Sequence, residues 1–221
     1  NYFSSLLTIP TEVIQQVHAL IKPEEEKNLN APFIPQSFLV GGSVVRPLLN
    51  LNSSDWDIGT NAPEKLFSAT CHKTRHDKKT LYQLNHFDFT LVSDLAEDSF
   101  QRDFTINALR VPLHGRTVIE DPTGLGLNDL QQKTIRLILK KKQTEDERLI
   151  ADPILMFRAC YFATVYHFTI ESKLLASIKC CANYLLQVST QRLLLRLKKM
   201  TTEQLKDFCS TLRTCGLNEI V

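Results

Sequence analysis

Residues 38–62 read FLVGGSVVRPLLNLNSSDWDIGTNA, and this stretch decides the fold. A short apolar run stops at Gly41 and Gly42, and a helix is predicted to begin near Ser43, because serine is a favoured N-cap residue. The free amide groups and partial positive charge of a helix N-terminus attract anions such as phosphate. The stretch therefore predicts a strand, a glycine turn with a phosphate site, a helix, a loop and a second strand.

The second predicted strand carries an Asp-x-Asp pair, formed by Asp55 and Asp57 on either side of Trp56. Side chains alternate along a strand, so both carboxylates share one face and Trp56 takes the other. Neighbouring carboxylates repel each other, and a divalent cation relieves that repulsion. Oxygen ligands suit Mg²⁺ held together with nucleotide phosphates. The pair predicts a metal site beside the phosphate turn, with a plain solvated turn as the alternative.

The composition sets wide limits on function. The chain has 221 residues, enough for one large or two small domains, and its net charge of +2 is too small to identify an RNA-binding protein. No apolar run approaches the roughly 20 residues that span a bilayer, and we expect neither a signal peptide nor membrane association. The six cysteines lack a C-x-x-C pair or a zinc-like spacing, so reduced thiols in a cytoplasmic protein are expected.

Residues 41–62 resemble motif A of the bacterial-type poly(A) polymerase and CCA-adding tRNA nucleotidyltransferase family. The chain departs from that motif at Val45, Arg46 and Asn50. The resemblance implies an α+β fold: a polymerase-β-type nucleotidyltransferase head, with a mixed sheet flanked by helices, followed by an all-helical neck. It spans roughly residues 37–200, and the matching residues of motif A are Gly41, Gly42, Val44, Leu48, Leu49, Asp55, Asp57 and Thr60.

A second motif, EDSFQRDFTINAL at residues 97–109, resembles family motif B, with Gln101 in place of an arginine. The resemblance implies that Asp103 helps to recognise the ribose, that Arg102 contacts a phosphate or the ribose, and that Asn107 belongs to the same nucleotide site. The alternative is a structural pair in which Arg102 and Asp103 cap a helix.

A third carboxylate is expected from the segment 81–92, whose end alternates as a strand does. Phe87 and Phe89 point one way and Asp88 the other. In heads of this family a metal-binding carboxylate comes from the strand beside the Asp-x-Asp pair, and the resemblance gives that role to Asp88. Without the resemblance, Asp88 is equally well an exposed strand residue.

Residues 148–163, RLIADPILMFRACYFA, resemble family motif D. The resemblance places Arg148, Asp152 and Arg158 at the nucleotide. In the family, the aspartate and the arginine three residues later read the base by hydrogen bonds, and here Leu155 replaces that arginine. Because leucine has no donor, a modest preference between ATP and CTP is expected.

The other elements follow from periodicity and turn signals. A head domain is predicted over residues 1–140 and a neck over 141–221. The remaining expectations are a helix over Pro10–Ile21 ended by Pro23, a short helix over Pro63–Thr70, a basic loop over 72–80, two strands within 111–121, a strand over Thr134–Leu139, and helices over Leu174–Leu186 and Thr201–Cys215 with Thr202 as a cap.

The resemblance implies a template-independent RNA nucleotidyltransferase that adds nucleotides from ATP, and from CTP as a further substrate, to an RNA 3′ end. Poly(A) and CCA addition are not separated, and the oligomeric state is open. Two Mg²⁺ ions are expected on Asp55, Asp57 and Asp88, and the triphosphate on Gly41, Gly42, Ser43 and Arg46. The alternative is a degenerate relative that binds nucleotide or RNA without catalysis, favoured by the departures Val45, Gln101, Ala151 and Leu155.

Overall fold

The computed structural model describes residues 9–25, 35–53, 55–76, 79–114, 118–198 and 200–219, and the chain forms two compact units. The first unit consists of Asn1–Arg102 and Asn107–Thr123, and the second of Asp103–Ile106 and Gly124–Val221. This division lies earlier in the chain than the predicted boundary between residues 140 and 141. Residues 124–140 fall in the second unit because Thr134–Ile135 pair with Thr169–Ile170 and Arg136 bonds to Glu171.

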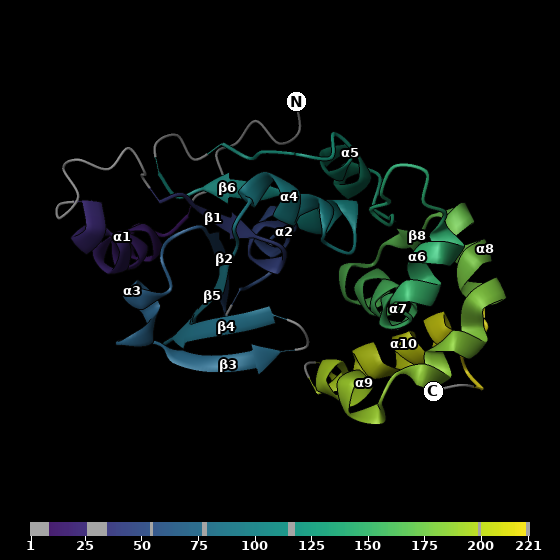
Figure 1. The fold of residues 1–221 in the computed structure, drawn as a ribbon. Helices are drawn as coiled ribbons and strands as arrows, with labels where there is room; N and C mark the ends of the chain where they lie inside the picture. Colours follow the sequence, from purple (N-terminus) through teal and green to yellow (C-terminus); the bar gives the residue numbers. More distant parts are fainter. Residues whose placement is uncertain are drawn as a thin grey trace. The chain divides into compact units, whose positions relative to one another are not determined.

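The first unit is built on a six-stranded mixed sheet in the order β3-β4-β5-β2-β1-β6 (Figure 1). Strands β2 and β5 are parallel, and every other neighbouring pair is antiparallel. The sheet flanked by helices confirms the predicted α+β class. Its strands are β1 Ser37–Val40, β2 Trp56–Thr60, β3 His72–His76, β4 Lys79–Leu84, β5 Phe87–Leu91 and β6 Arg110–Pro112, and its helices are α1 Thr11–Glu25, α2 Gly42–Leu48, α3 Lys65–Ser68 and α4 Leu95–Phe100.

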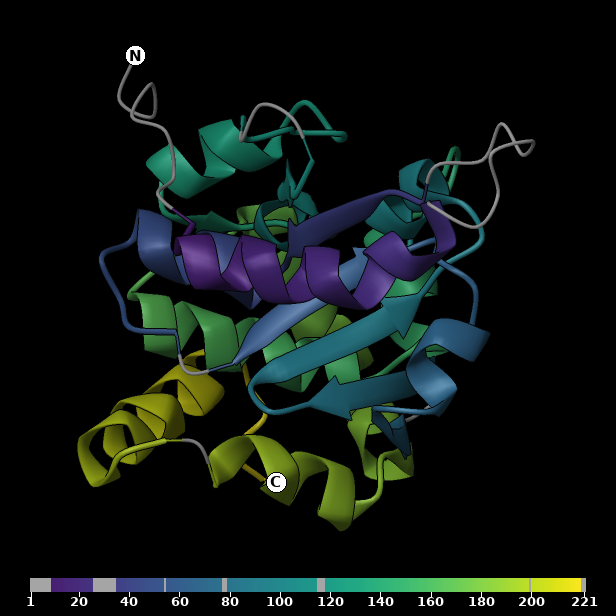
Figure 2. The ribbon, with the colours of Figure 1, turned by 90° about the vertical axis from the view of Figure 1, so that its left-hand side faces the viewer.

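One face of this sheet is apolar and holds the core of the first unit. Ile58, Tyr82 and Phe89 are each about 1% exposed, and the ring of Phe67 in α3 lies 5.7 Å from that of Tyr82 and 5.2 Å from that of Phe89. Full burial of such a side chain contributes about 1.5–3 kcal/mol. Helix α1 lies across the sheet (Figure 2). Alternation along β2 and β5 places their aspartates on the opposite face.

Two predicted elements of the first unit are wrong in kind or extent. The basic segment 72–80 is not a loop, because its backbone forms β3 and the start of β4, paired from His72↔Gln83 to His76↔Lys79. Strand β3 is an edge strand, where lysine and other charged side chains are normal. Helix α1 continues past Pro23 to Glu25, since a proline near a helix end removes only one backbone hydrogen bond.

Several boundaries also differ from the prediction. The predicted helix 63–70 shortens to α3, and the strand over 134–139 to β7, Thr134–Ile135. Of the two strands within 111–121, the described residues show β6 and an isolated Arg110↔Glu120 bridge, and the turn residues 115–117 lie outside the described ranges. The helix predicted over 174–186 is split into α8, Ser172–Cys181, and a 3₁₀ helix, Ala182–Gln187.

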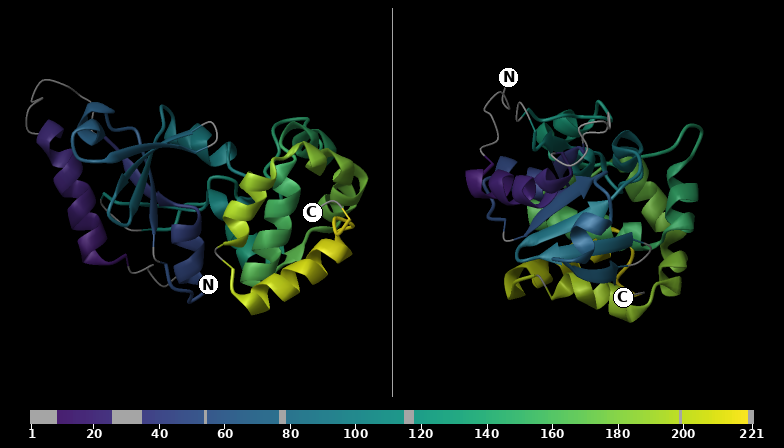
Figure 3. Two further views of the ribbon diagram at one scale, coloured as in Figure 1. Left: turned by 90° about the horizontal axis from the view of Figure 1, so that it is seen from below. Right: turned by 60° about the vertical axis from the view of Figure 1, so that its left-hand side comes forward.

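The second unit is mainly helical, and its other elements pack around α7. Twelve of the thirteen residues of α7 are buried, and α10 packs alongside it (Figure 3), with the rings of Phe157 and Phe208 5.0 Å apart. The cap of α10 is Thr201 rather than Thr202, within a capping box completed by Gln204. The further elements are α5 Gly126–Gln131, α6 Glu145–Ala151, α7 Ile154–Tyr166, α9 Thr190–Leu197, α10 Thr202–Thr214 and the strands β7 and β8, Thr169–Ile170, which pair in parallel.

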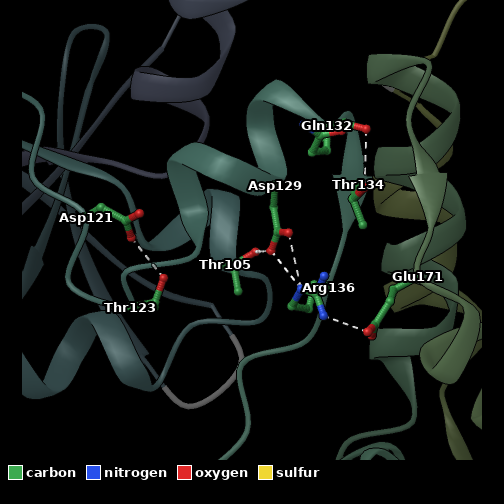
Figure 4. Close-up of polar contacts among 8 residues, drawn as sticks. All are labelled: Thr105, Asp121, Thr123, Asp129, Gln132, Thr134, Arg136 and Glu171. Carbon is green, nitrogen blue, oxygen red and sulfur yellow. Dashed lines mark hydrogen bonds and ion pairs between the residues drawn. The ribbon is translucent and has the colours of Figure 1, made fainter. Parts of the chain in front are cut away.

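A buried carboxylate joins four segments of the second unit (Figure 4). Asp129 is 1% exposed and accepts hydrogen bonds from Thr105 Oγ1 at 2.7 Å and from Arg136 Nε at 3.0 Å. Arg136 Nη1 also donates to Glu171 Oε1 at 2.6 Å. Thr105 N donates to Arg136 O at 3.0 Å. These bonds explain why the short segment 103–106 belongs to the second unit although its neighbours in sequence belong to the first.

In the described part of the chain, no single helix is long and apolar enough to cross a membrane. Helices α6 and α7 reach that length only as a pair bent by 107°.

Candidate active site

Two of the three predicted metal-binding carboxylates lie side by side in the sheet. The parallel pairing of β2 and β5 sets Asp57 directly against Asp88. Neighbouring strands lie about 4.8 Å apart, and residues in register point to the same face. Asp57 is exposed and Asp88 half-buried, so the carboxylates face solvent rather than the core. Asp55, which is also exposed, immediately precedes β2. The alternation of residues in the sequence predicted which face of the strand carries Asp57. The register of β2 with β5 shows that Asp88 lies beside it.

The hydroxyl of Ser43 fixes the backbone that carries the two aspartates. Ser43 Oγ accepts a hydrogen bond from Asp57 N at 2.7 Å and donates to Asp55 O at 3.3 Å, and Ser43 is 1% exposed. The N-cap of α2 is Gly41 rather than Ser43. The side chain of Ser43 therefore holds α2 against the loop of the Asp-x-Asp pair. Sequence reasoning missed this contact, because it joins residues brought together by the pairing of β1 and β2.

Gly41 meets two requirements that favour glycine. Its φ of 60° lies in the left-handed region, and a Cβ at this position would lie 3.3 Å from Arg102 Nη1. Arg102 is held by Asp98, which accepts from its Nη2 at 2.7 Å and from its Nε at 3.2 Å. The guanidinium group thus lies against the glycine turn. The predicted phosphate turn and the predicted arginine are adjacent in the first unit.

Asp88 is itself positioned by a neighbour. Gln83 in β4 lies in register with Asp88, and its Nε2 donates to Asp88 Oδ1 at 2.8 Å. Two predicted nucleotide residues of the first unit remain. Arg46 is half-exposed in the last turn of α2, and Asn107 is 5% exposed in the 3₁₀ helix Thr105–Ala108.

In the second unit, Asp103 pairs with Arg158 rather than capping a helix with Arg102. Asp103 Oδ2 accepts from Arg158 Nε at 2.7 Å and also from Nη2, while Oδ1 accepts from Phe104 N at 2.9 Å. Asp103 is 8% exposed. Two predicted nucleotide residues, 55 positions apart, are therefore joined to each other.

The other predicted residues of the second unit lie at the bend between α6 and α7. Arg148 is half-exposed in α6, and Asp152 is its C-cap, with Asp152 N donating to Arg148 O at 3.2 Å. Leu155, at the place of the base-reading arginine, is 2% exposed. Asp55, Asp57 and Asp88 belong to the first unit and Asp103, Arg148, Asp152 and Arg158 to the second.

A pocket of about 460 Å³ in the first unit lies next to the Arg102–Asp98 pair, and the three carboxylates are not among its described lining residues. Its lining includes a charged cluster in which Glu64 accepts from Lys73 Nζ at 2.9 Å and from the Tyr82 hydroxyl. The hydrogen bond from Lys73, followed by that from Tyr82, lowers the pKa of Glu64. These contacts link α3 to β3 and β4, and account for the cluster as part of the fold.

Another set of potential metal ligands lies in the second unit. The donor atoms of Asp146, Cys180 and Cys181 lie within 4.8 Å of one another. Thiolates favour softer ions than Mg²⁺, whereas the aspartates of β2 and β5 offer the oxygen donors that Mg²⁺ prefers. The chemistry of the donors therefore favours the aspartates of the sheet over this cluster for the predicted Mg²⁺ ions.

Comparison with known families gives a match to the head domain of poly A polymerase over residues 64–136. A CCA-adding enzyme of Levilactobacillus brevis is 33% identical over 193 residues, which cover 76% of this chain and 47% of that protein. An A-adding tRNA nucleotidyltransferase of Deinococcus radiodurans is 30% identical over 151 residues, which cover 63% of this chain and 33% of that protein. The chain spans about half the length of the first of these relatives and a third of the second.

Among solved structures, the Thermotoga maritima CCA-adding enzyme in complex with tRNA superposes with a TM-score of 0.73 at 22% sequence identity. The superposition covers 97% of this chain and 54% of the other. At this identity the likeness establishes the fold.

Proposed function

Because the chain belongs, over its head and neck portion, to the poly(A) polymerase and CCA-adding tRNA nucleotidyltransferase family, we propose that it transfers nucleotides from ATP or CTP to the 3′ end of an RNA without a template. The observation that supports this most is the register of Asp57 with Asp88 on parallel strands, with Asp55 beside them. Asp57 and Asp88 share the solvent face of the sheet and Asp55 immediately precedes β2, which supports the three carboxylates as the proposed metal ligands. We further propose that the reaction takes place in the cytoplasm.

The transfer makes one phosphorus–oxygen bond and breaks another. The RNA 3′-oxygen bonds to the α-phosphorus of the nucleoside triphosphate, the bond from that phosphorus to pyrophosphate breaks, and the hydroxyl proton leaves to water. Two Mg²⁺ ions, when bound, supply charge stabilisation for the attacking and leaving oxygens. Asp55 and Asp57 would hold both ions, and Asp88 would hold the one that activates the 3′-hydroxyl.

The carboxylate set fits such ions. Its donors are hard oxygens, Asp55 and Asp57 are exposed, and Mg²⁺ is usually bound by one or two carboxylates with water and substrate phosphates completing its shell. Ser43 fixes the backbone of the pair, so the positions from which the two side chains extend are set before substrate arrives. This preorganisation is what charge stabilisation of a transition state requires.

The nucleotide residues are assigned by the resemblance and supported by local geometry. In the first unit, Gly41 and Gly42 receive the triphosphate, and Arg102 lies next to them with its guanidinium oriented by Asp98. Arg46 adds a positive charge at the far end of α2. In the second unit, Asp103 is held by Arg158, and its role toward the ribose is exercised from that fixed position.

One measurement distinguishes an active transferase from a relative that binds nucleotide or RNA without catalysis. The protein is incubated with Mg²⁺, a short RNA and labelled ATP or CTP, and extension of the RNA is scored. Extension that disappears in Asp57→Asn supports the transferase. Nucleotide binding without extension would support the non-catalytic relative, which the departures Val45, Gln101, Ala151 and Leu155 favour.

A further inference from the structure

Four polar side chains form a row across the open face of the sheet in the first unit. The register pairs Asp57 with Asp88, Asp88 with Gln83, and Gln83 with His72, across strands β2, β5, β4 and β3. Residues directly in register on neighbouring strands point to the same side. The row therefore begins at the candidate metal site and crosses β4 to reach β3 at the edge of the sheet.

Within this row, Gln83 holds only one oxygen of its neighbour. Its Nε2 donates to Asp88 Oδ1 at 2.8 Å, and among the described residues Asp88 Oδ2 has no hydrogen-bond partner. A carboxylate oxygen accepts and does not donate, so the amide nitrogen of Gln83 is the atom that faces it. One oxygen of Asp88 is engaged from the side of β4, and the other remains available to a cation shared with Asp57.

The chemical type of the neighbour matters as much as its position. A lysine or arginine at residue 83 would place a positive charge beside Asp88 and compete with a metal ion for it. An amide orients the carboxylate without neutralising it. Hydrogen-bonding partners of metal-binding side chains set ligand orientation, and their loss typically lowers metal affinity or activity by about 10- to 100-fold.

We propose that Gln83 is a positioning residue for the metal site: it fixes the rotamer of Asp88 so that Oδ2 faces the ion shared with Asp57. The proposal rests on the proposed function, because it requires the carboxylates of β2 and β5 to bind a divalent cation. It goes beyond the family motifs quoted above, because residue 83 lies outside all of them.

The test measures binding of Mn²⁺, a spectroscopic substitute for Mg²⁺, by electron paramagnetic resonance of the free ion. Gln83→Met keeps the side-chain length and removes the donor. Gln83→Thr is a second variant that suits a strand and cannot reach Asp88. The same chemical change at an exposed glutamine of α5, Gln131→Met, is the matched control. Melting temperatures are recorded for every variant.

We expect both Gln83 variants to weaken one class of Mn²⁺ site by about tenfold or more, at an unchanged melting temperature, while the control binds as wild type. In the transfer assay, the Mg²⁺ concentration for half-maximal rate should rise by a similar factor, with the rate recovered at high Mg²⁺. Asp88→Asn should remove the same class of site. Adding Gln83→Met to it should then have no further effect, because Gln83 acts through Asp88.

Unchanged Mn²⁺ binding in both Gln83 variants would overturn the positioning role and leave the proposed function intact. An equal loss from Gln83→Met with and without Asp88→Asn would also overturn it, because the effect would then not pass through Asp88. If the wild type binds no Mn²⁺, the proposed function fails, and the inference fails with it.

Discussion

The substitution Asp129→Ala tests whether the polar network of Figure 4 holds the second unit together. It removes the acceptor for Thr105 Oγ1 and for Arg136 Nε, and Asp129 is 1% exposed, so both partners lose a bond in a buried place. A hydrogen bond to a charged group contributes about 1.5–3 kcal/mol, and breaking a buried ion pair costs about 3–5 kcal/mol.

The full cost is reduced by the surroundings of Arg136. Its side chain is 33% exposed and keeps its bond to Glu171 at 2.6 Å, so water and Glu171 compensate part of the loss. We therefore expect the free energy of unfolding to fall by about 2–4 kcal/mol.

The measurement is urea unfolding followed by circular dichroism at a helical wavelength, because most of the longer helices belong to the second unit. The fluorescence of Trp56, the single tryptophan of the chain, reports on the first unit in the same samples. Asp207→Ala removes an exposed carboxylate from α10 in the second unit, and is expected to change stability by less than about 0.5 kcal/mol. A loss below about 1 kcal/mol for Asp129→Ala, or one no larger than that of the control, would refute the reasoning.

Three further predictions concern the proposed reaction. Asp55→Asn and Asp57→Asn should each abolish nucleotide transfer at an unchanged melting temperature, since both residues are exposed; near-normal activity in either variant would contradict the metal assignment. RNA binding should be weak, with a log–log salt slope of about two to four in magnitude, because a net charge of +2 leaves few phosphate contacts; nanomolar affinity for tRNA at physiological salt would oppose this. The ratio of specificity constants for ATP and CTP should be modest, because Leu155 offers no donor to the base. A wild-type ratio of about a thousandfold would show that other residues read the base. The substitution Leu155→Arg should lower the melting temperature, because residue 155 is 2% exposed.

The sequence predicted those parts of the site that depend on local pattern. Alternation around Trp56 and along the strand of Asp88 placed the carboxylates on a shared face, and Gly-Gly after an apolar run predicted the turn before α2. The segment 72–80 was predicted as a loop because it is highly charged and contains no apolar alternation. Its strand form depends on pairing between β3 and β4.

Contacts between distant residues could not be read from the sequence. Asp103 and Arg158 were both expected at the nucleotide, but their ion pair with each other was not predicted, and neither was the pair of Arg102 with Asp98. The hydroxyl of Ser43 and the amide of Gln83 are the same kind of case. Each is a polar residue whose partner depends on which strands pair and in which register, and register is fixed by the whole sheet rather than by a local motif.

The assignment of residues 103–106 to the second unit limits where this chain can be cut into fragments or joined to parts of a relative. The backbone passes between the two units three times, at 102/103, 106/107 and 123/124, so no single cut separates them. A fragment beginning at Gly124 would lack Thr105, and would leave Asp129 without one of its donors and Leu137 without its bridge to Phe104. An exchange of helical portions between relatives should therefore carry the segment DFTI with the helices, although it lies in the sequence of the head.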